Sequence, residues 1–258
     1  MNIVKLDQNR IILIHDDCLH AMNAIKPSAI DLIFADLPYG TTQCKWDTVI
    51  PFQPLWIHFN RIAKSRIPFV FTAREPFTSV LVQSNITKYH HKWVWNKKQS
   101  GSFQTAKYMP LQIEEDVIVF GDRPNYYPQM RTGRMRQRGG ASQTNNAMGD
   151  NGLTAGYENW SDQYFPTNIL DIANPRRNKL HPTEKPLELM EYLIKTYSKP
   201  NDTVLDPVMG SASTGAACVN LNRKFIGIEK DENYFNIAVQ KIKEALELRD
   251  AKTAGVNK

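Results

Sequence analysis

Short apolar runs in the first half of the chain are separated by stretches long enough to form helices. The run at residues 31–35 is typical, because it is apolar after Asp31 and ends directly at Asp36. Such runs, alternating with helical stretches, favour a parallel, doubly wound α/β sheet. The predicted strands are residues 10–14, 31–35, 67–71, 92–95 and 116–120, and the predicted helices between the first of them are residues 18–25 and 54–64.

The same alternation returns after residue 181. Pro186 suits the first turn of a helix, and apolar side chains then recur at helical spacing as far as Tyr197. Residues 232–248 are predicted as an amphipathic closing helix, and residues 249–258 are expected to fray. Between these helices lie predicted strands at residues 203–205 and 224–228 and a predicted helix at residues 213–222.

The middle of the chain is basic and has little to bury. Five arginines and no acidic residue occur between residues 123 and 138. This composition predicts a loop or a small subdomain laid over the core. Arginines of this kind suit contacts to phosphates or guanine edges, although a solvated basic loop would have the same composition. The arginines are Arg123, Arg131, Arg134, Arg136 and Arg138.

Other basic and aromatic residues flank this segment. Lys97, Lys98 and Lys107 could extend the basic track toward a nucleic acid. Trp93 and Trp95 lie within a predicted strand, so we expect them in the core rather than in a stacking platform.

Composition excludes several classes of protein. The net charge of +6 is compatible with a polyanionic partner but does not demonstrate one. No apolar run approaches the roughly 18 residues of a membrane-spanning helix. Three widely spaced cysteines, Cys18, Cys44 and Cys218, indicate reduced thiols in a cytoplasmic compartment. No His or Cys spacing resembles a metal site, so no metal is expected.

A glycine turn lies between a predicted strand and a predicted helix in the stretch from Thr203 to Gly215. Backbone amides and the positive end of the helix dipole would face a ligand there. Glu229 ends the next predicted strand and suits ribose hydroxyls as an acceptor. An ordinary strand–turn–helix corner would also use the glycine, but it would not need the acid.

The same turn discriminates between nucleotide ligands. A dinucleotide fingerprint requires a second glycine for the approach of a pyrophosphate, whereas this chain has Ala212. S-adenosylmethionine has ribose and adenine but no pyrophosphate, so an alanine at this position interferes less with its binding. No Gly-Lys-Ser/Thr follows, which excludes a P-loop. The turn therefore favours S-adenosylmethionine over NAD.

A second chemical signature, Asp36-Leu37-Pro38-Tyr39, follows a predicted strand at the edge where open α/β sheets bind ligands. Methylation of an exocyclic amine requires acceptors for the NH₂ group, and the Asp36 carboxylate and the Leu37 carbonyl supply them. Tyr39 offers an aromatic plane for a base that has left the duplex. Pro38 favours an extended Leu37, which directs its carbonyl outward. Taken alone, the tetrapeptide fits a tight turn as well.

Four segments together resemble the motifs of the β group of S-adenosylmethionine-dependent DNA amino-methyltransferases. Residues 36–39 look like the catalytic motif, and residues 206–215 look like the cofactor loop. Residues 181–186 and 225–229 are similar to two further motifs. The catalytic motif precedes the cofactor loop, as in the β group. The resemblance implies a Rossmann-like, doubly wound, mostly parallel methyltransferase sheet with a circularly permuted motif order.

The resemblance also divides the chain. It implies that residues 1–121 form the catalytic half of a methyltransferase domain and residues 171–258 its cofactor-binding half. Residues 122–170 are then an inserted target-recognition region.

Roles for individual residues are implied by the same motifs. The residues expected to bind and orient the flipped base are Asp36, Leu37, Pro38 and Tyr39. The residues expected to bind the cofactor are Asp17, Cys18, Asp36, Thr183, Lys185, Asp206, Val208, Gly210, Ser211, Ser213 and Glu229. Among them, Thr183 and Lys185 are expected on the carboxylate side of the cofactor, and Asp17 at its adenine. Asp17 also suits the N-cap of a helix.

Three positions depart from the family pattern. Leu37 replaces a proline whose assigned role is a backbone carbonyl, so this change should be tolerated. Val208 replaces an aromatic residue that packs against the cofactor, so weaker binding is expected. Ala212 replaces a glycine and adds a methyl group near the cofactor. We expect methyltransferase activity to survive all three changes.

The implied reaction is direct in-line attack of the amine on the sulfonium methyl group, without a covalent enzyme intermediate or a catalytic cysteine. The acid at Asp36 favours adenine N6 in double-stranded DNA, because members that act on cytosine N4 more often have serine there. An N4-cytosine methyltransferase, a nucleotide-dependent oxidoreductase and a catalytically inactive DNA-binding module are the alternatives. Relatives of the β group often form dimers, so a homodimer is also open.

Overall fold

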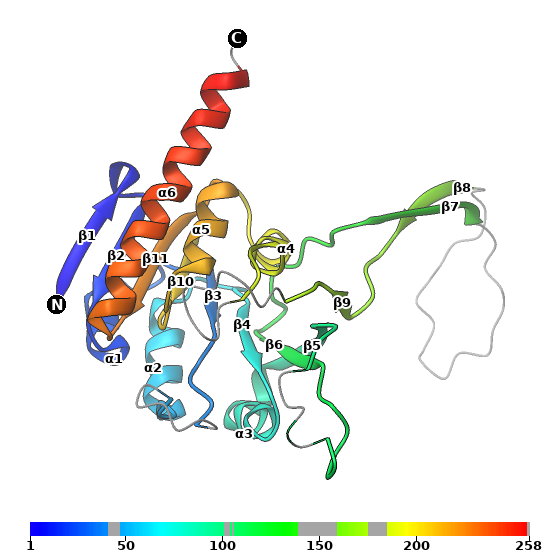
Figure 1. The fold of residues 1–258 in the computed structure, drawn as a ribbon, viewed down its shortest axis with the longest axis horizontal. Coiled ribbons are helices and arrows are strands. Elements are labelled where there is room, and N and C mark those ends of the chain that lie inside the picture. The colour runs from blue at the N-terminus through cyan, green and yellow to red at the C-terminus, as the bar shows by residue number, and fades with distance from the viewer. Residues whose placement is uncertain (41–46, 101–103, 105, 139–158, 175–184, 257–258) are drawn as a thin grey trace. The chain divides into compact units, whose positions relative to one another are not determined.

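A computed structural model describes residues 1–40, 47–100, 104, 106–138, 159–174 and 185–256. The chain divides into two compact units. The first comprises Met1–Tyr127 and Asn168–Lys258, and the second comprises Pro128–Thr167. The first unit contains the large sheet and the helices that cover it (Figure 1).

Nine strands of the described residues form one sheet in the order β1-β2-β11-β10-β3-β4-β6-β5-β9. The five strands from β2 to β4 in this order run parallel, whereas β1 and β6 pair antiparallel with their neighbours. The prediction of a mostly parallel, doubly wound sheet is confirmed. The strands are β1 (Asn2–Leu6), β2 (Ile11–His15), β3 (Leu32–Ala35), β4 (Phe69–Ala73), β5 (Tyr89–Asn96), β6 (Glu114–Phe120), β9 (Ile169–Asp171), β10 (Thr203–Asp206) and β11 (Lys224–Glu229).

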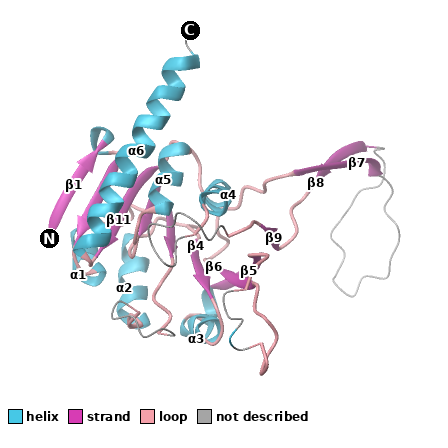
Figure 2. Ribbon diagram, viewed as in Figure 1, coloured by secondary structure: helices cyan, strands magenta, loops and turns pink. Residues whose placement is uncertain are grey.

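The central strands are buried on both faces. On β3, Leu32 and Phe34 belong to one hydrophobic cluster, and Ile33 and Ala35 belong to the other. Successive strand side chains point to opposite faces, so a strand that is apolar at every position needs cover on both sides. Side chains of helices α4, α5 and α6 pack into the cluster that contains Leu32 and Phe34, and side chains of α1, α2 and α3 pack into the cluster on the other face (Figure 2). The helices are α1 (Cys18–Ala21), α2 (Phe52–Ile62), α3 (Phe77–Ser84), α4 (Leu187–Tyr197), α5 (Ser213–Asn220) and α6 (Glu232–Val256).

The closing helix is longer than the sequence suggested. Fraying was expected from residue 249, but α6 continues to Val256, so this prediction was wrong. Arg249 donates to both carboxylate oxygens of Asp7, at 2.7 and 3.2 Å. Arg249 also pairs with Asp250 at 2.8 Å, so the last turns of the helix have partners that its sequence spacing did not reveal. Strand β1 and helix α3 were likewise not predicted.

The second unit contains a hairpin of β7 (Arg131–Arg138) and β8 (Asn159–Tyr164). A loop or small subdomain was expected here, because the segment has little apolar surface. Cross-strand contacts take the place of a core: the Arg136 guanidinium lies 4.5 Å from the centre of the Tyr164 ring. The Tyr164 hydroxyl donates to the Arg134 carbonyl at 2.6 Å. Cation–π and cross-strand pairs of this kind stabilise a hairpin without deep burial.

Strand β9 pairs with β5 of the large sheet, with Leu170 opposite Trp95. The last residues of the expected insertion, 122–170, therefore lie in the first unit. Leu170 is buried, and the Trp95 indole donates to the Ile172 carbonyl at 2.8 Å.

Candidate active site

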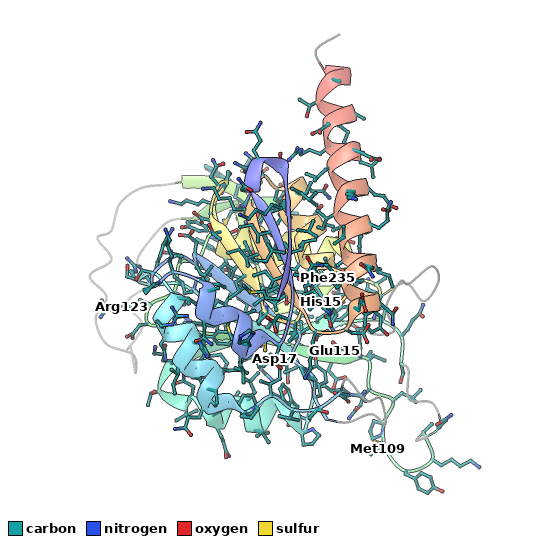
Figure 3. All side chains as sticks on the ribbon, turned by 90° about the vertical axis from the view of Figure 1, so that its left-hand side faces the viewer. His15, Asp17, Met109, Glu115, Arg123 and Phe235 are labelled. Atoms are coloured by element: carbon teal, nitrogen blue, oxygen red, sulfur yellow. The ribbon has the colours of Figure 1, made fainter. Side chains whose placement is uncertain are left out.

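The carboxyl ends of four neighbouring strands carry the acidic residues singled out from the sequence. In sheet order, β2 leads to Asp17, β11 ends at Glu229, β10 ends at Asp206 and β3 leads to Asp36. These strands are parallel, so all four ends lie at one edge of the sheet. With about 4.8 Å between neighbouring strands, the four ends span about 14 Å. Figure 3 shows Asp17 and His15 near the N-terminal end of α6, where Phe235 lies.

Asp36 accepts hydrogen bonds from three side chains. Its Oδ1 accepts hydrogen bonds from the Tyr39 hydroxyl at 2.9 Å and from the Thr72 hydroxyl. Its Oδ2 accepts from the Lys185 ammonium at 2.6 Å. These three donors come from the turn after β3, from β4 and from the segment before α4, and they fix the carboxylate at the edge of the sheet.

The rest of the tetrapeptide follows from its local packing. The Leu37 side chain is buried and Pro38 is half-buried. The Tyr39 ring stacks against Phe77 of α3, with centroids 5.0 Å apart. Burial, together with the nearby Asp36 carboxylate, raises the pKa of Tyr39, so its hydroxyl stays a donor at neutral pH. The tetrapeptide is therefore held by side-chain contacts beyond those of a simple turn.

Lys185 lies against the Asp36 carboxylate. The resemblance implied a place beside the cofactor carboxylate, whereas the structure gives its ammonium two carboxylate neighbours, Asp36 at 2.6 Å and Glu115 at 3.6 Å. These carboxylates raise the pKa of Lys185 against the opposing effect of burial. Thr183, with the rest of residues 181–184, lies outside the described residues.

Four further residues adjoin this network. Thr72 contacts Asp36, Glu115 contacts Lys185, and Phe77 packs against Tyr39; these three were not singled out from the sequence. The fourth, Lys97, pairs with Glu115. Thr72 follows a predicted strand and Glu115 precedes one, so their position at strand ends was a usable signal. Lys97 was expected to extend a basic track toward DNA. That prediction was wrong, because Lys97 is only 8% exposed and pairs with Glu115 at 3.1 Å.

Asp206 is a buried carboxyl group at the end of β10. The Thr214 hydroxyl donates to its Oδ2 at 2.7 Å, and the Val208 amide donates to its Oδ1 at 3.1 Å. Burial raises the pKa of Asp206 to about 7, despite these hydrogen bonds, and the carboxylates of Asp36 and Glu229 act in the same direction. Asp206 therefore changes charge near neutral pH.

Glu229, at the end of β11, binds the turn that follows β10. Its Oε2 accepts from the Gly210 amide at 2.9 Å, and its Oε1 accepts from the Asp231 amide at 2.8 Å. Burial raises the pKa of Glu229, while these amides oppose the shift. Each carboxylate oxygen accepts a hydrogen bond from one of these amides and keeps a further lone pair. That lone pair can accept a hydrogen bond from a neighbouring diol.

The turn after β10 uses two residues in the left-handed conformation. Gly210 has a φ of 52°, which costs glycine little. Ala212, at the N-cap of α5, has φ 60° and ψ 41° and is fully buried. An alanine in this region is strained by about 1–2 kcal/mol, which explains why a glycine is usual there. The alanine thus departs from the family pattern at a cost in backbone strain.

Replacing Ala212 with glycine is expected to leave the free energy of unfolding almost unchanged. Relief of strain of about 1–2 kcal/mol offsets the lost methyl burial and the greater freedom of glycine in the unfolded chain. Ala216, inside α5, is the matched control, because Ala216→Gly should cost about 1 kcal/mol. Urea unfolding of both variants measures the difference, and equal losses would contradict the strain at Ala212.

The other expected cofactor residues lie around this loop. Asp17 caps α1 by accepting from the Leu19 amide at 3.0 Å, and its second oxygen lies 3.5 Å from Lys230. The N-cap interpretation is thus confirmed, with 46% of the side chain still exposed. Cys18 is buried, and burial raises the pKa of its thiol to about 12. Ser211 is buried, and Ser213 accepts from the Lys241 ammonium at 2.9 Å.

Two cysteines and two tryptophans remain among the residues named from the sequence. Cys218, Trp93 and Trp95 are buried, as expected for core residues. Cys44 lies outside the described residues.

The predicted DNA-contacting arginines do not all fall in one unit. Arg123 belongs to the first unit, where it is exposed and its carbonyl accepts from the Arg66 side chain at 3.2 Å. The other four lie on β7 of the second unit, and the side chain of Arg138 is outside the described residues. The described part of β7 exposes Arg131, Arg134 and Arg136.

No cluster of three or more His, Cys, Asp or Glu side chains within the described residues is arranged to hold a metal ion. None of the helices that the structure describes is long and apolar enough to cross a membrane.

Comparison with known proteins bears directly on this edge of the sheet. A family model described as DNA methylase matches residues 30–240, a span that contains Asp36, Asp206 and Glu229. The chain is also similar to a protein of Escherichia coli (strain K12) named DNA adenine methyltransferase YhdJ. The two are 27% identical over 268 residues, which cover 95% of this chain and 87% of that protein.

Solved structures show the same fold. A complex of M1.HpyAVI with SAM matches with a TM-score of 0.60 and 23% identity, covering 90% of this chain and 98% of that one. The PvuII DNA methyltransferase, described as cytosine-N4-specific, matches with a TM-score of 0.63 and 14% identity, covering 93% and 91% of the two chains. At these identities the likeness concerns the fold alone.

Proposed function

The chain belongs to the family of N6/N4 DNA methylases, S-adenosylmethionine-dependent DNA amino-methyltransferases, and from this premise we propose that it methylates the N6 amine of adenine in double-stranded DNA. The observation that carries the choice of base is the Asp36 carboxylate at the end of β3. Cytosine-N4 enzymes of the family more often have serine at this position. The adenine methyltransferase named among the relatives supports the same choice.

In this proposal, Asp36 and the Leu37 carbonyl accept hydrogen bonds from the target NH₂ group. Two acceptors on one nitrogen favour a tetrahedral amine whose lone pair is free to react. Tyr39, held against Phe77 at 5.0 Å, supports the plane of a base flipped out of the duplex, and Pro38 orients Leu37. The amine attacks the methyl carbon directly, the carbon–sulfur bond breaks, and the nitrogen then releases a proton to solvent.

S-adenosylmethionine supplies the methyl group from its sulfonium centre. We assign the ribose hydroxyls to Glu229, the methionine ammonium to Asp206 and the adenine amine to Asp17, because each is an acceptor at the same edge of the sheet. The smaller residues assigned to the lining of this site are Cys18, Val208, Gly210, Ser211 and Ser213. Thr183 and Lys185 are assigned to the carboxylate side, with the Lys185 ammonium shared with Asp36.

DNA recognition is assigned to the region of residues 122–170, between the catalytic half (1–121) and the cofactor-binding half (171–258). The exposed arginines of β7 can neutralise phosphates or contact guanine, and Arg123 adds a further cation from the first unit. A cytoplasmic enzyme follows from a DNA substrate and reduced thiols. Homodimer formation remains a proposal drawn from the β group.

Expression of the protein in a host without DNA methylation tests the function. The genomic DNA is digested to nucleosides, and the modified nucleoside is identified by mass spectrometry. N6-methyladenine is the expected product. N4-methylcytosine would establish the alternative specificity, and the absence of both, with the protein folded, would favour an inactive DNA-binding module.

Cofactor affinity is expected to depend on pH. If ionised Asp206 binds the methionine ammonium, protonation below its pKa of about 7 removes the attraction, so affinity falls as the pH falls. Well below that pKa the dissociation constant should rise about tenfold per pH unit. Calorimetry between pH 5.5 and 8 measures this in buffers of about constant ionic strength. Asp206→Asn should bind weakly with a flat profile, and a flat profile for the unsubstituted protein would remove this role from Asp206.

A further inference from the structure

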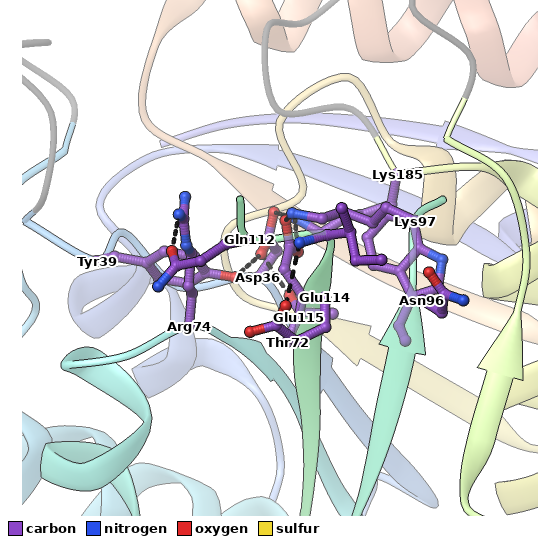
Figure 4. A network of polar contacts seen from close by, with 12 residues as sticks. Asp36, Tyr39, Thr72, Arg74, Asn96, Lys97, Gln112, Glu114, Glu115 and Lys185 are labelled. Carbon is purple, nitrogen blue, oxygen red and sulfur yellow. Dashed lines mark hydrogen bonds and ion pairs between the residues drawn. The ribbon is translucent and has the colours of Figure 1, made fainter. Parts of the chain in front are cut away.

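Three charged side chains of alternating sign lead away from Asp36, the proposed base-binding acid (Figure 4). Asp36 contacts Lys185 at 2.6 Å, and Lys185 contacts Glu115 at 3.6 Å. Glu115 in turn contacts Lys97 at 3.1 Å. The residues come from four separate segments, namely the turn after β3, the segment before α4, β6 and the end of β5. We call these four residues the charge chain.

The three members of the charge chain beyond Asp36 are shielded from water. The side chains of Lys185, Lys97 and Glu115 are 9%, 10% and 15% exposed. Buried charges are costly unless their signs balance, and the chain has two carboxylates and two ammonium groups. No hydrogen-bond donor among the described residues reaches the Glu115 Oε2 atom. This atom lies 3.6 Å from the Lys185 ammonium, so the two groups interact by electrostatic attraction.

Lys185 would be a poor neighbour for Asp36 if it acted alone. A full ion pair occupies Oδ2 and reduces the strength of the carboxylate as an acceptor for an amine. Glu115 lies on the other side of the same ammonium and shares its charge, while Lys97 offsets the charge of Glu115. The charges of the four residues in the chain therefore sum to zero.

We infer that Glu115 and Lys97 are positioning residues that tune Asp36 through Lys185, an inference that rests on the proposed methyl transfer. During transfer, positive charge moves from the cofactor onto the target amine, next to Asp36. A surplus positive charge behind Asp36 opposes that movement, because Coulomb interactions are strong where water is excluded. Glu115 and Lys97 therefore lower the barrier without touching either substrate.

A double-mutant cycle tests the inference. Glu115→Gln leaves one surplus positive charge, and its kcat should fall about tenfold or more, with little change in the KM for S-adenosylmethionine. Lys97→Met leaves one surplus negative charge, which draws Lys185 toward Glu115 and takes from Asp36 Oδ2 the donor that fixes its orientation, so its kcat should fall by about threefold or more. The double variant Glu115→Gln/Lys97→Met restores neutrality and should exceed each single variant in kcat.

Matched controls are available for both residues. Glu114 is the exposed neighbour of Glu115 on β6, and Lys224 is an exposed lysine at the start of β11, so Glu114→Gln and Lys224→Met should retain the unsubstituted kcat. Thermal unfolding checks that each variant is folded. If Glu115→Gln does not fold, the comparison of Lys97→Met with the double variant still decides, because only charge balance predicts that a second substitution raises kcat.

Two results would overturn the inference: a Glu115→Gln enzyme as active as Glu114→Gln, or a double variant no more active than the single variants. Failure of the proposed function is distinguishable, because the unsubstituted protein would then not methylate DNA. Methylation by the unsubstituted protein together with an additive cycle would remove only the role of the charge chain.

Discussion

Asp36→Asn is expected to lower the rate of methyl transfer by about 10²–10³-fold, the effect of removing one preorganised electrostatic group from an active site. The amide keeps the shape of the side chain and an acceptor for Tyr39 and Thr72, which donate to Oδ1. It loses the negative charge that Lys185 contacts and that stabilises positive charge on the amine. Binding of S-adenosylmethionine should stay within about threefold, because Glu229 and Asp206, the acceptors proposed for the ribose and the ammonium, lie on other strands.

The measurement is single-turnover transfer of a labelled methyl group to DNA, with calorimetry for the cofactor. Asp171→Asn is the control, since Asp171 is an exposed acid at the end of β9 in the same sheet and lies outside the proposed site. Asp36→Asn with a rate close to that of Asp171→Asn would remove the base-orienting role from Asp36.

Glu229→Ala is expected to weaken S-adenosylmethionine binding by about 10–100-fold. The carboxylate accepts hydrogen bonds from the amides of Gly210 at 2.9 Å and Asp231 at 2.8 Å, so it holds the turn after β10 in addition to its proposed contact with the ribose. Hydrogen bonds to charged groups contribute about 1.5–3 kcal/mol, which corresponds to this loss. The rate at saturating cofactor should fall far less than in Asp36→Asn.

Glu232→Gln, at the exposed first turn of α6, is the control for Glu229. Calorimetric titration gives the dissociation constants, and thermal unfolding without cofactor shows whether the loop itself is lost. Unchanged affinity in a folded Glu229→Ala protein would place the ribose elsewhere.

Much of the fold could be predicted because the central strands are buried on both faces. A strand such as β3 needs apolar residues at every position, and that pattern is visible without a structure. Edge elements have no such requirement: β1 lies at the edge of the sheet with mostly exposed or half-buried side chains, and it was missed. The β7–β8 hairpin was missed for a related reason, since arginine–tyrosine contacts leave no apolar periodicity.

The candidate site divides in the same way. Asp36, Asp206 and Glu229 each end or follow a strand, so their places along the chain already imply one edge of a parallel sheet. The partners of Asp36 come from distant segments: Lys185 is 149 positions away, and Thr72 is 36 positions away. No local pattern links such residues.

The sequence by itself determined the order of the motifs along the chain, the family, and the acids expected at the edge of the sheet. It could do so because the apolar pattern of a buried strand and the residues of a loop motif are local in the chain. Only the tertiary structure decided that Lys97 and Glu115 belong with Lys185 behind Asp36, and that Ala212 is strained. The physical reason is that the balance of buried charge and the backbone conformation of a turn depend on which segments meet in space. Lys97 shows the difference most clearly. Its place in the sequence suggested a contact with DNA, whereas in the fold it is buried and forms an ion pair with Glu115.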